Sequence, residues 1–186
     1  MKKREKYDVL AGILAFIVAV NILLYFYDAK EIVSSIGIEN TYIVIFIMAV
    51  IGGLSALTGA ALFTTITAFA AGGAEPLILA LAGGAGIFIS DTIFYFLALH
   101  GRRSVPDDWD KILNKIENRI EKYPKWMVLT GMYIYIGFTP LPNDVLMIVL
   151  VIAGYTYKNI MWVLLAGSFT IAMVTAYLEH IILGMI

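Results

Sequence analysis

The sequence predicts an all-α integral membrane protein, and three observations lead to that prediction. Of the 186 residues, 61% are hydrophobic, against roughly 45–50% in a soluble domain. Two nearly uncharged stretches are too long for one crossing of about 20 residues and are interrupted midway. The order of these stretches also repeats. We expect an inverted repeat of a re-entrant helical hairpin plus a transmembrane helix, with an N-terminal transmembrane helix and a cytoplasmic amphipathic helix.

Composition and charge exclude several classes of function. The net charge of −1 gives no global positive field, so we expect no nucleic acid among the partners. The chain has no cysteine, which removes disulfides, thiolate metal sites and cysteine catalysis. Its two histidines, His100 and His180, lie far apart in sequence and do not predict a metal cluster. We expect no cofactor and no bound metal.

Residues 9–27 are predicted to form the first transmembrane helix. This run of 19 residues is long enough to span roughly 30 Å of hydrocarbon, and no small-residue cleavage site follows it. We therefore expect the helix to be retained, with the N-terminus in the cytoplasm, because basic residues favour that side. The basic residues that precede the run are Lys2, Lys3, Arg4 and Lys6.

The next apolar stretch, residues 41–74, is predicted to form a re-entrant hairpin. Its 34 residues include no charge, and they are too many for one crossing and too few for two crossings with a loop. The middle of the stretch is rich in glycine and small hydroxylated residues. A helix can break there if neighbouring protein covers the freed backbone groups.

A transmembrane helix is predicted at residues 77–100, with Asp91 as its single charge. Arg102 and Arg103 follow directly and place the loop at residues 101–125 in the cytoplasm.

Within that loop, residues 105–124 are predicted to form an amphipathic helix. Apolar side chains recur there at helical spacing, Pro106 lies near the start, and Pro124 ends the pattern. The helix either lies on the membrane surface or packs only on protein.

Residues 126–157 are predicted to form the second re-entrant hairpin, and residues 159–184 the last transmembrane helix. Pro140 and Pro142 cannot lie inside one regular helix, since proline removes a backbone donor and clashes with a preceding carbonyl. The arm before them, which ends at Phe138, is about 20 Å long as a helix, so the break falls inside the bilayer.

The two halves also resemble each other weakly in sequence. In the first half AAGG is followed by LAGG, and in the second IAGY is followed by LAGS. Together with the basic clusters, this order predicts that the two hairpins enter from opposite sides of the membrane.

Motifs in both halves point to one family. Gly86, Asp91 and Tyr95 form a G-x3–4-D-x3-Y pattern, followed by the basic pair Arg102 and Arg103. The second half contains GFTPLPNDVLMIVLVIAGYTYKN, a proline-marked break with an alanine-glycine end. Over roughly residues 41–184 the chain resembles the DedA/VTT superfamily in these features. The resemblance implies two re-entrant hairpins facing each other, transport of polyprenyl-phosphate carriers in prokaryotes, and phospholipid scrambling in eukaryotic relatives.

The chain departs from the family pattern in two places. Many DedA proteins carry a P-x-P-G-E-type motif in the first hairpin, where this chain has SALTGAALFTT without proline or carboxylate. They also carry an arginine just before the second proline break, whereas residues 126–186 contain no arginine. The charged elements that the family ties to proton-coupled transport are missing or relocated, which indicates a divergent branch.

Two membrane-depth carboxylates are the first candidates for a substrate or ion pathway. Such a group is costly in the bilayer and usually faces a cavity or a partner. Asp144 either binds a proton or cation or caps the second half-helix through its amides. Asp91 either belongs to the pathway or is a structural hydrogen-bond partner that holds a hairpin break in place. The other residues assigned to the pathway are Asn143, Pro140, Pro142, Thr139 and Tyr95.

Arg102 and Arg103 have two interpretations. Their guanidinium groups suit bidentate contacts with a lipid phosphate, so they are candidate phosphate-binding residues. Alternatively, they only set the orientation of the protein.

The leading hypothesis is a transporter or scramblase-like protein of the cell membrane, not an enzyme. It would move an anionic amphipathic lipid, a polyprenyl-phosphate or a phospholipid, with coupling to protons or cations through the embedded aspartates. Its partners would be membrane lipids, a lipid-linked phosphate carrier and protons or cations, with a homo-oligomer left open. The alternatives are an integral membrane lipid-processing enzyme, which needs a convergent catalytic constellation, and a non-catalytic assembly or scaffold protein.

Overall fold

The computed structural model describes residues 34–52, 56–102, 119–120, 122–139 and 143–178. All regular structure within these ranges is helical, which confirms the predicted all-α class. The predicted helix at residues 9–27 and most of the predicted helix at residues 105–124 lie outside them. The described helices are α3 (Ile38–Gly52), α4 (Ala56–Ala71), α5 (Pro76–Arg102), α7 (Lys125–Phe138), α8 (Asn143–Ile152) and α9 (Tyr157–Ala176).

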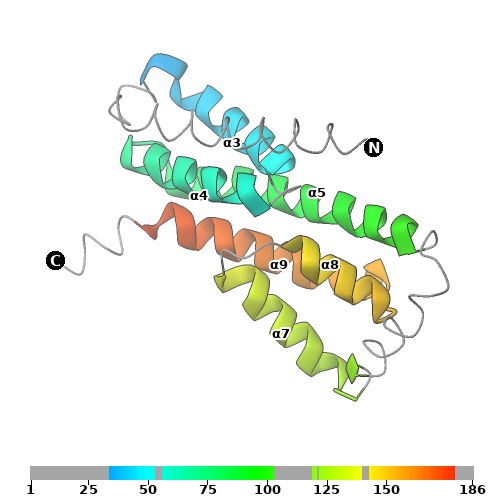
Figure 1. Cartoon of the computed structure of the whole chain (residues 1–186). Coiled ribbons are helices and arrows are strands. Elements are labelled where there is room, and N and C mark those ends of the chain that lie inside the picture. Colours follow the sequence, from blue (N-terminus) through cyan, green and yellow to red (C-terminus); the bar gives the residue numbers. More distant parts are fainter. Residues whose placement is uncertain (1–33, 53–55, 103–118, 121, 140–142, 179–186) are drawn as a thin grey trace.

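Helices α5 and α9 form the centre of the molecule, run in opposite directions and pack against each other (Figure 1). Both are long and apolar enough to cross a membrane. At 1.5 Å per residue, α5 is about 40 Å long and α9 about 30 Å. Only 44% of the most apolar window of each helix is buried in the protein, so more than half faces outward. Helix α9 begins at Tyr157, close to the predicted start at residue 159, and its regular part is described to Ala176. Residues 179–184 of the predicted helix lie outside the described residues.

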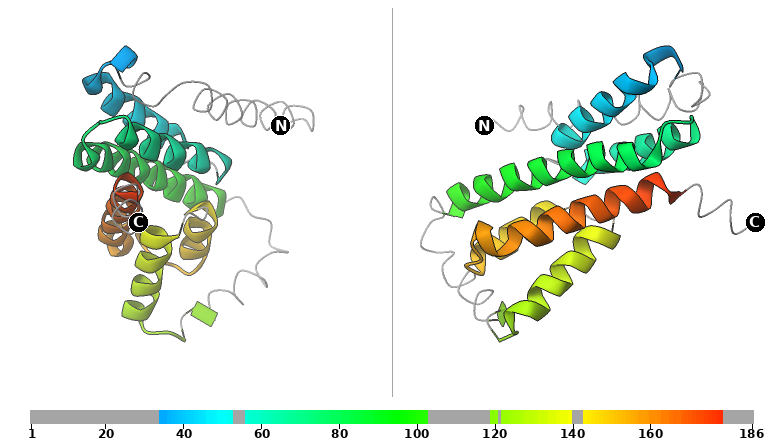
Figure 2. Two further views of the ribbon diagram at one scale, coloured as in Figure 1. Left: turned by 90° about the vertical axis from the view of Figure 1, so that its left-hand side faces the viewer. Right: turned by 180° about the vertical axis from the view of Figure 1, so that it is seen from behind.

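Each long helix is preceded by two shorter ones. Helices α3 and α4 precede α5, and α7 and α8 precede α9. The α3–α4 pair lies toward the end of the bundle where α5 begins, and the α7–α8 pair lies toward the end where α5 finishes (Figures 1 and 2). Helix α7 ends at Phe138 and α8 begins at Asn143, which places the second break where the prolines predict it. Pro140 and Pro142 themselves lie outside the described residues.

The turns that lead into the two long helices have the same structure. Gly73 and Gly154 both have positive φ, 95° and 74°, a conformation that glycine adopts without a steric penalty. Each turn contains the same two backbone hydrogen bonds. In the first turn the N–H of Gly73 donates to the carbonyl of Ala70, and that of Ala74 to the carbonyl of Phe69. In the second the N–H of Gly154 donates to the carbonyl of Val151, and that of Tyr155 to the carbonyl of Leu150. This is the Schellman motif, which satisfies carbonyls at a helix end. The two turns are 81 positions apart.

The same shift of 81 positions superimposes the burial pattern of α5 on that of α9. Seven buried positions of α5 correspond to seven buried positions of α9. The positions in α5 are 79, 83, 86, 87, 90, 91 and 95, and those in α9 are 160, 164, 167, 168, 171, 172 and 176. The stretches LAGG and LAGS, which look alike in sequence, are offset by three positions in this correspondence.

Gly86 and Gly167 occupy equivalent positions at the crossing of each long helix with its first short helix. A Cβ atom added to Gly86 would lie 2.7 Å from the carbonyl oxygen of Phe46 in α3 and would also clash with Ala49. A Cβ atom added to Gly167 would lie 2.7 Å from Ile136 in α7. Any larger residue would separate the helices, so both crossings depend on glycine.

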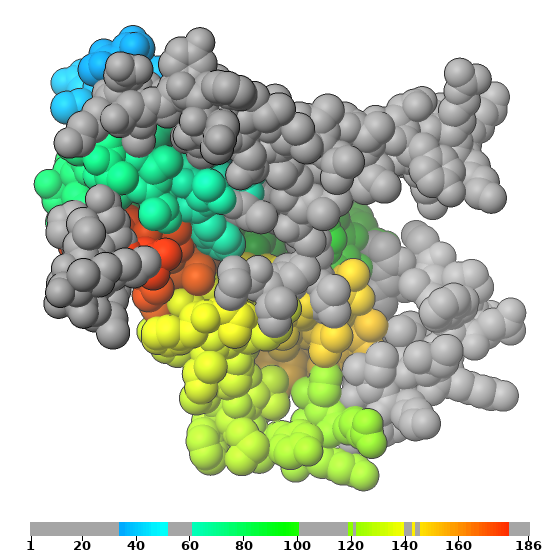
Figure 3. Space-filling model, turned by 60° about the vertical axis from the view of Figure 1, so that its left-hand side comes forward, coloured from blue at the N-terminus to red at the C-terminus, as the bar shows by residue number. Residues whose placement is uncertain are grey.

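The helix contacts complete the correspondence. Helix α3 packs on α5 as α7 packs on α9, and α4 contacts α9 as α8 contacts α5. The space-filling view shows the end of α9 between α4 and α7 (Figure 3). Helices α3 and α4 also pack against each other, whereas α7 and α8 hardly touch. The described part therefore consists of two similar three-helix units, related by an approximate half turn about an axis between α5 and α9.

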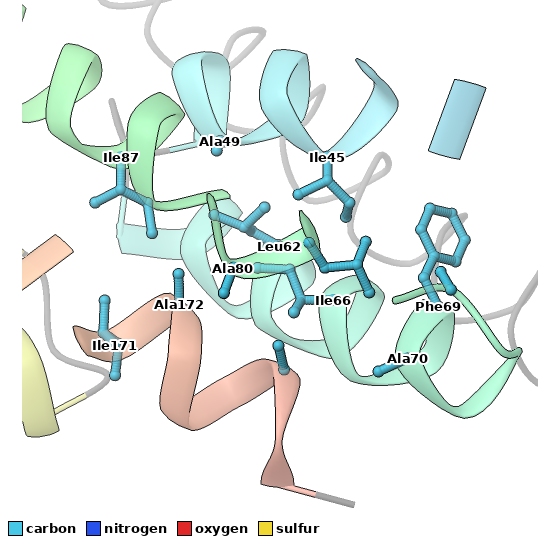
Figure 4. Packing of buried hydrophobic residues seen from close by; sticks show 13 residues of the cluster. Ile45, Ala49, Leu62, Ile66, Phe69, Ala70, Ala80, Ile87, Ile171 and Ala172 are labelled. Atoms are coloured by element: carbon cyan, nitrogen blue, oxygen red, sulfur yellow. The ribbon is translucent and has the colours of Figure 1, made fainter. Parts of the chain in front are cut away.

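The interior contains two hydrophobic clusters. The first joins α3, α4, the first half of α5 and the end of α9, and Leu62 from α4 and Ala172 from α9 both point into it (Figure 4). The second joins the later half of α5 with α7, α8 and the start of α9. Its largest fully buried side chains are Ile136, Met147, Leu150, Ile160 and Leu164.

The glycine crossings predict a stability test. Gly86→Ala and Gly167→Ala should each destabilise the protein by about 1–3 kcal/mol, because the added methyl group meets atoms that cannot move away. Gly131 in α7 is the matched control, since a Cβ atom there meets nothing within 4 Å. Gly131→Ala should stabilise by roughly 0.5–1 kcal/mol through helix propensity. Reversible unfolding in mild detergent measures the stability of all three variants. Equal effects at the three sites would contradict the claim that the two helix crossings depend on glycine.

Candidate functional site

The described interior contains one buried acidic side chain, that of Asp91 in α5. The side-chain amide of Asn143, the first residue of α8, donates to both of its carboxylate oxygens, at 3.0 Å to Oδ2 and 3.3 Å to Oδ1. Taking a carboxylate out of water is costly unless hydrogen bonds replace its hydration. Asn143 supplies part of that replacement.

The helix break determines where Asn143 lies. Because α8 begins at residue 143, its first turn stands beside the middle of α5 and not at either end of the bundle. A helix N-terminus carries a partial positive charge and unpaired amide groups, both of which favour a nearby anion. The amide of Asn143 and the start of α8 therefore act in the same direction on the Asp91 carboxylate.

Two further hydrogen bonds fasten the α8–α9 turn to α5. The hydroxyl of Tyr95, one helical turn after Asp91, donates to the carbonyl of Tyr155 at 2.9 Å. Thr92 Oγ1 and the Tyr157 hydroxyl lie 3.0 Å apart. The ring of Tyr157 also packs against Tyr95 and Phe96, with centroid separations of 5.6 and 5.3 Å. Polar contacts thus continue from Asp91 toward the start of α9.

Among the described residues, three buried side-chain oxygens have no hydrogen-bond partner: Oγ of Ser90, Oδ1 of Asn143 and Oγ of Ser168. Buried polar atoms are nearly always paired with protein or ordered water, because an unpaired one costs about 1–3 kcal/mol. Ser90 precedes Asp91 directly, and Asn143 donates to it. The surroundings of Asp91 therefore contain unused acceptors suited to water.

We name the residues Ser90, Asp91, Thr92, Tyr95, Asn143, Tyr157 and Ser168 the polar group. Their counterparts at a shift of 81 positions are all apolar: Ile171, Ala172, Met173, Ala176, Leu62, Pro76 and Ile87. Leu62 and Ala172, the counterparts of Asn143 and Asp91, lie together in the first hydrophobic cluster. The polar chemistry therefore lies where α5 meets α8 and α9, and the positions equivalent to it, where α9 meets α4 and α5, are apolar.

Threonines in the first unit do not form a second polar group. The hydroxyls of Thr41, Thr65 and Thr67 each donate to the carbonyl four residues earlier in their own chain segment. Thr175, near the end of α9, does the same. Bonding to the carbonyl four residues earlier is a common way for threonine to be accommodated in an apolar helix. The Thr67 hydroxyl also lies 3.3 Å from the carbonyl oxygen of Thr175 in α9.

The arrangement suits a proton or a small cation better than a cofactor. Within the described ranges no three histidine, cysteine or acidic residues come together as metal ligands would. A carboxylate beside an amide can exchange a proton, or offer two kinds of oxygen to a monovalent ion. No described group of residues forms a nucleophile–base pair near Asp91.

The predicted pathway residues are brought together only in part. Asp91, Asn143 and Tyr95 belong to one site, whereas Thr139 ends α7 and its hydroxyl bonds to the carbonyl of Tyr135. Asp144 is the second residue of α8, and its side chain is not among the described parts. The same holds for the side chain of Arg102, the last residue of α5, while Pro140, Pro142 and Arg103 lie outside the described residues.

Sequence reasoning missed Thr92, Tyr157 and Ser90. Thr92 and Ser90 flank a charged residue in an apolar helix, and this position could have identified them as site residues. The sequence does not identify Tyr157, because a tyrosine at a helix start resembles an interfacial anchor.

No protein-family model, curated protein or solved structure matches this chain. The class that the structure itself defines is an all-α protein with two helices long and apolar enough to cross a membrane.

The pairing of Asp91 with Asn143 predicts non-additive stability effects. Asn143→Leu alone should destabilise the protein by about 1–3 kcal/mol, since the buried carboxylate loses its donor. Asn143→Leu combined with Asp91→Ala should recover most of this loss, because it installs the two residue types that already pack at the counterpart positions. Unfolding in detergent of both single variants and the double variant measures the coupling. Simple additivity would show that the pair does not interact.

Proposed function

We propose that this chain is a membrane-embedded transporter or scramblase-like protein that moves an anionic amphipathic lipid, with Asp91 and Asn143 as its proton- or cation-binding centre. The observation that supports this most strongly is the burial of one hydrogen-bonded carboxylate beside a helix break, in a described interior with no other charged side chain. Ionisable groups at such depth are typical of ion and substrate pathways in membranes.

The outer surface supports membrane insertion. Large apolar side chains point outward along α3, α5 and α9, among them Ile43, Ile47, Ile51, Leu81, Leu97 and Trp162. A soluble monomer rarely exposes so much contiguous apolar surface. Lipid removes this difficulty, since it solvates such side chains.

The charges of the described residues support one orientation. Glu39 and Glu75 lie at the end of the bundle where α5 begins (Figure 1). Lys122, Lys125 and Lys158 lie at the end where α5 finishes and where α7 and α9 begin (Figure 1). We call these the acidic end and the basic end. Basic residues accumulate on the cytoplasmic side of membrane proteins, so the basic end is cytoplasmic in this proposal.

The repeat supports transport over a purely structural role. In this orientation the α3–α4 pair enters from the acidic end and the α7–α8 pair from the basic end, as re-entrant hairpins. Arms of 10 to 16 residues are about 15–24 Å long, too short to cross. Inverted repeats with broken helices near the midplane are characteristic of secondary transporters. The DedA/VTT resemblance agrees with this arrangement, and we place the chain there as a divergent branch.

The centre can adopt two hydrogen-bonded states. When Asp91 is ionised, the amide of Asn143 donates to it, as in the structure. When Asp91 is protonated, its O–H can donate to Oδ1 of Asn143, an acceptor that is now unused. Rotation of the Asn143 side-chain amide converts one state into the other, so proton uptake changes the hydrogen bonding at the start of α8. In this scheme the change accompanies movement of the anionic head group.

A lipid-processing enzyme is less well supported. Catalysis requires a nucleophile with a base, or a metal with several ligands, converging on one point. Asp91 has the amide of Asn143 beside it, and the described residues contain no group of three histidine, cysteine or acidic side chains.

Reconstitution of the purified full chain in liposomes tests the proposal. With fluorescent phospholipid and fluorescent polyprenyl-phosphate as separate probes, at least one head group should move between leaflets faster than in empty vesicles, at a rate that depends on pH. Asp91→Asn should reduce the rate to that of empty vesicles, since it cannot exchange a proton. Glu75→Gln, which changes an exposed carboxylate at the acidic end, is the matched control and should retain the wild-type rate.

Failure of the wild-type protein to move either lipid would reject the transport proposal. If Asp91→Asn then altered stability or retention of a partner protein, a scaffold would be the better description.

A further inference from the structure

We propose that water and protons reach Asp91 from the basic end only, along a path lined by Thr92, Tyr95 and Tyr157. The proposal rests on the transport function inferred above and adds the side from which the centre is loaded. It follows from how polarity is distributed around Asp91, a feature that the fold does not require.

The path begins at a partly exposed residue. Tyr157 is the first residue of α9 at the basic end, and its hydroxyl lies 3.0 Å from Thr92 Oγ1. Thr92 is adjacent to Asp91 in α5, and Tyr95 follows Asp91 by one turn in the same direction. Hydroxyl groups donate and accept simultaneously, so they can pass a proton or hold a water molecule in line.

In the opposite direction, Ser90 is the last buried hydroxyl on α5, directly before Asp91. On the buried face of α5 between Asp91 and the acidic end lie Ile87, Gly83 and Leu79, at successive steps of four residues. Ile87 and Leu79 belong to the first hydrophobic cluster, together with Leu62 and Ala172. Beyond Ser90 this face of α5 offers water no side-chain hydrogen-bond partner, and the hydroxyls of Thr65, Thr67 and Thr175 already donate to backbone carbonyls.

Comparison of the two units separates function from packing. Thr92, Tyr95 and Tyr157 correspond to Met173, Ala176 and Pro76, which build the same turn and the same crossing without any hydroxyl group. The scaffold therefore forms with apolar residues at these positions. Their polarity at only one of the two equivalent contacts between the units points to a use other than folding.

The charged and titratable groups around the path are few among the described residues. On α5 itself they are Tyr95, His100 and Arg102, on α9 and the preceding turn Tyr155, Tyr157 and Lys158, on α8 Asp144, and on α7 Lys125, Tyr133 and Tyr135. Helix α3 contributes Glu39 and Tyr42 at the acidic end, and α4 contributes none. Asp91 and Asp144 are therefore the two carboxyl groups at mid-depth, and Asp91 is the one next to Thr92 on the path.

The absence of natural cysteine allows a direct test in the full-length protein. Thr92→Cys reports on the path and Met173→Cys on the equivalent position of the other unit, where the side chain is buried to a similar degree. Lys158→Cys and Glu75→Cys mark the basic and acidic ends. A membrane-impermeant, charged thiol reagent is applied to sealed membrane vesicles of each orientation. Each variant is first checked for wild-type chromatographic behaviour and thermal stability.

The expected result is labelling of Thr92→Cys from the side that labels Lys158→Cys, at least about tenfold faster than Met173→Cys from either side, because a thiol ionises and reacts only where water reaches it. Labelling of Thr92→Cys from the side that labels Glu75→Cys would overturn the proposal. Labelling as slow as that of Met173→Cys would also overturn it. Labelling is independent of lipid movement, so a one-sided result without transport would leave the path and reject only the proposed function.

Discussion

The burial of the Asp91 carboxylate constrains most of the structure around it. A charge-bearing group at this depth needs donors, and the apolar helices supply none from their faces. The donor is Asn143, the first residue of α8, which lies beside the middle of α5. That start requires the chain to break between Phe138 and Asn143. The Schellman turn and the hydroxyls of Tyr95 and Thr92 then hold the other end of α8 and the start of α9 against α5.

The two units show which part of this arrangement belongs to the scaffold. Gly86 and Gly167 allow the same close crossing, and Gly73 and Gly154 the same turn. The first unit, however, has six more helical residues before its turn, because α4 has 16 residues and α8 has 10. Helix α4 therefore continues past the level at which α8 begins. Leu62 occupies the place of Asn143 and faces Ala172 across an apolar cluster. Equal scaffolds with unequal interiors indicate that the polar group was added for a purpose other than folding.

The sequence predicted the elements better than their relations. Two prolines spaced by one residue located the break between α7 and α8, since proline cannot continue a helix. The length of the stretch at residues 41–74 predicted two short helices in place of one. The register between the units was misjudged for LAGG and LAGS, because small residues are common in apolar helices and align by chance. The correct register depends on a turn geometry and a burial pattern that appear only in three dimensions.

The site shows the same limit. Asp91 and Asn143 were both singled out as polar residues in apolar surroundings, and each was identifiable alone. Their contact joins residues 52 positions apart and depends on how α8 packs against α5, which composition does not encode. Tyr157 was beyond reach for the same reason, since its partner Thr92 is 65 positions away.

The central claim is that Asp91 and Asn143 serve a function that the scaffold does not need. Lipid movement by the double variant Asp91→Ala, Asn143→Leu in liposomes tests it most directly, because that variant imitates the apolar contact of Ala172 with Leu62 and should remain folded. Our account predicts a stable protein that moves lipid no faster than empty vesicles at any pH. Movement at the wild-type rate with the wild-type pH dependence would show that the pair is only structural.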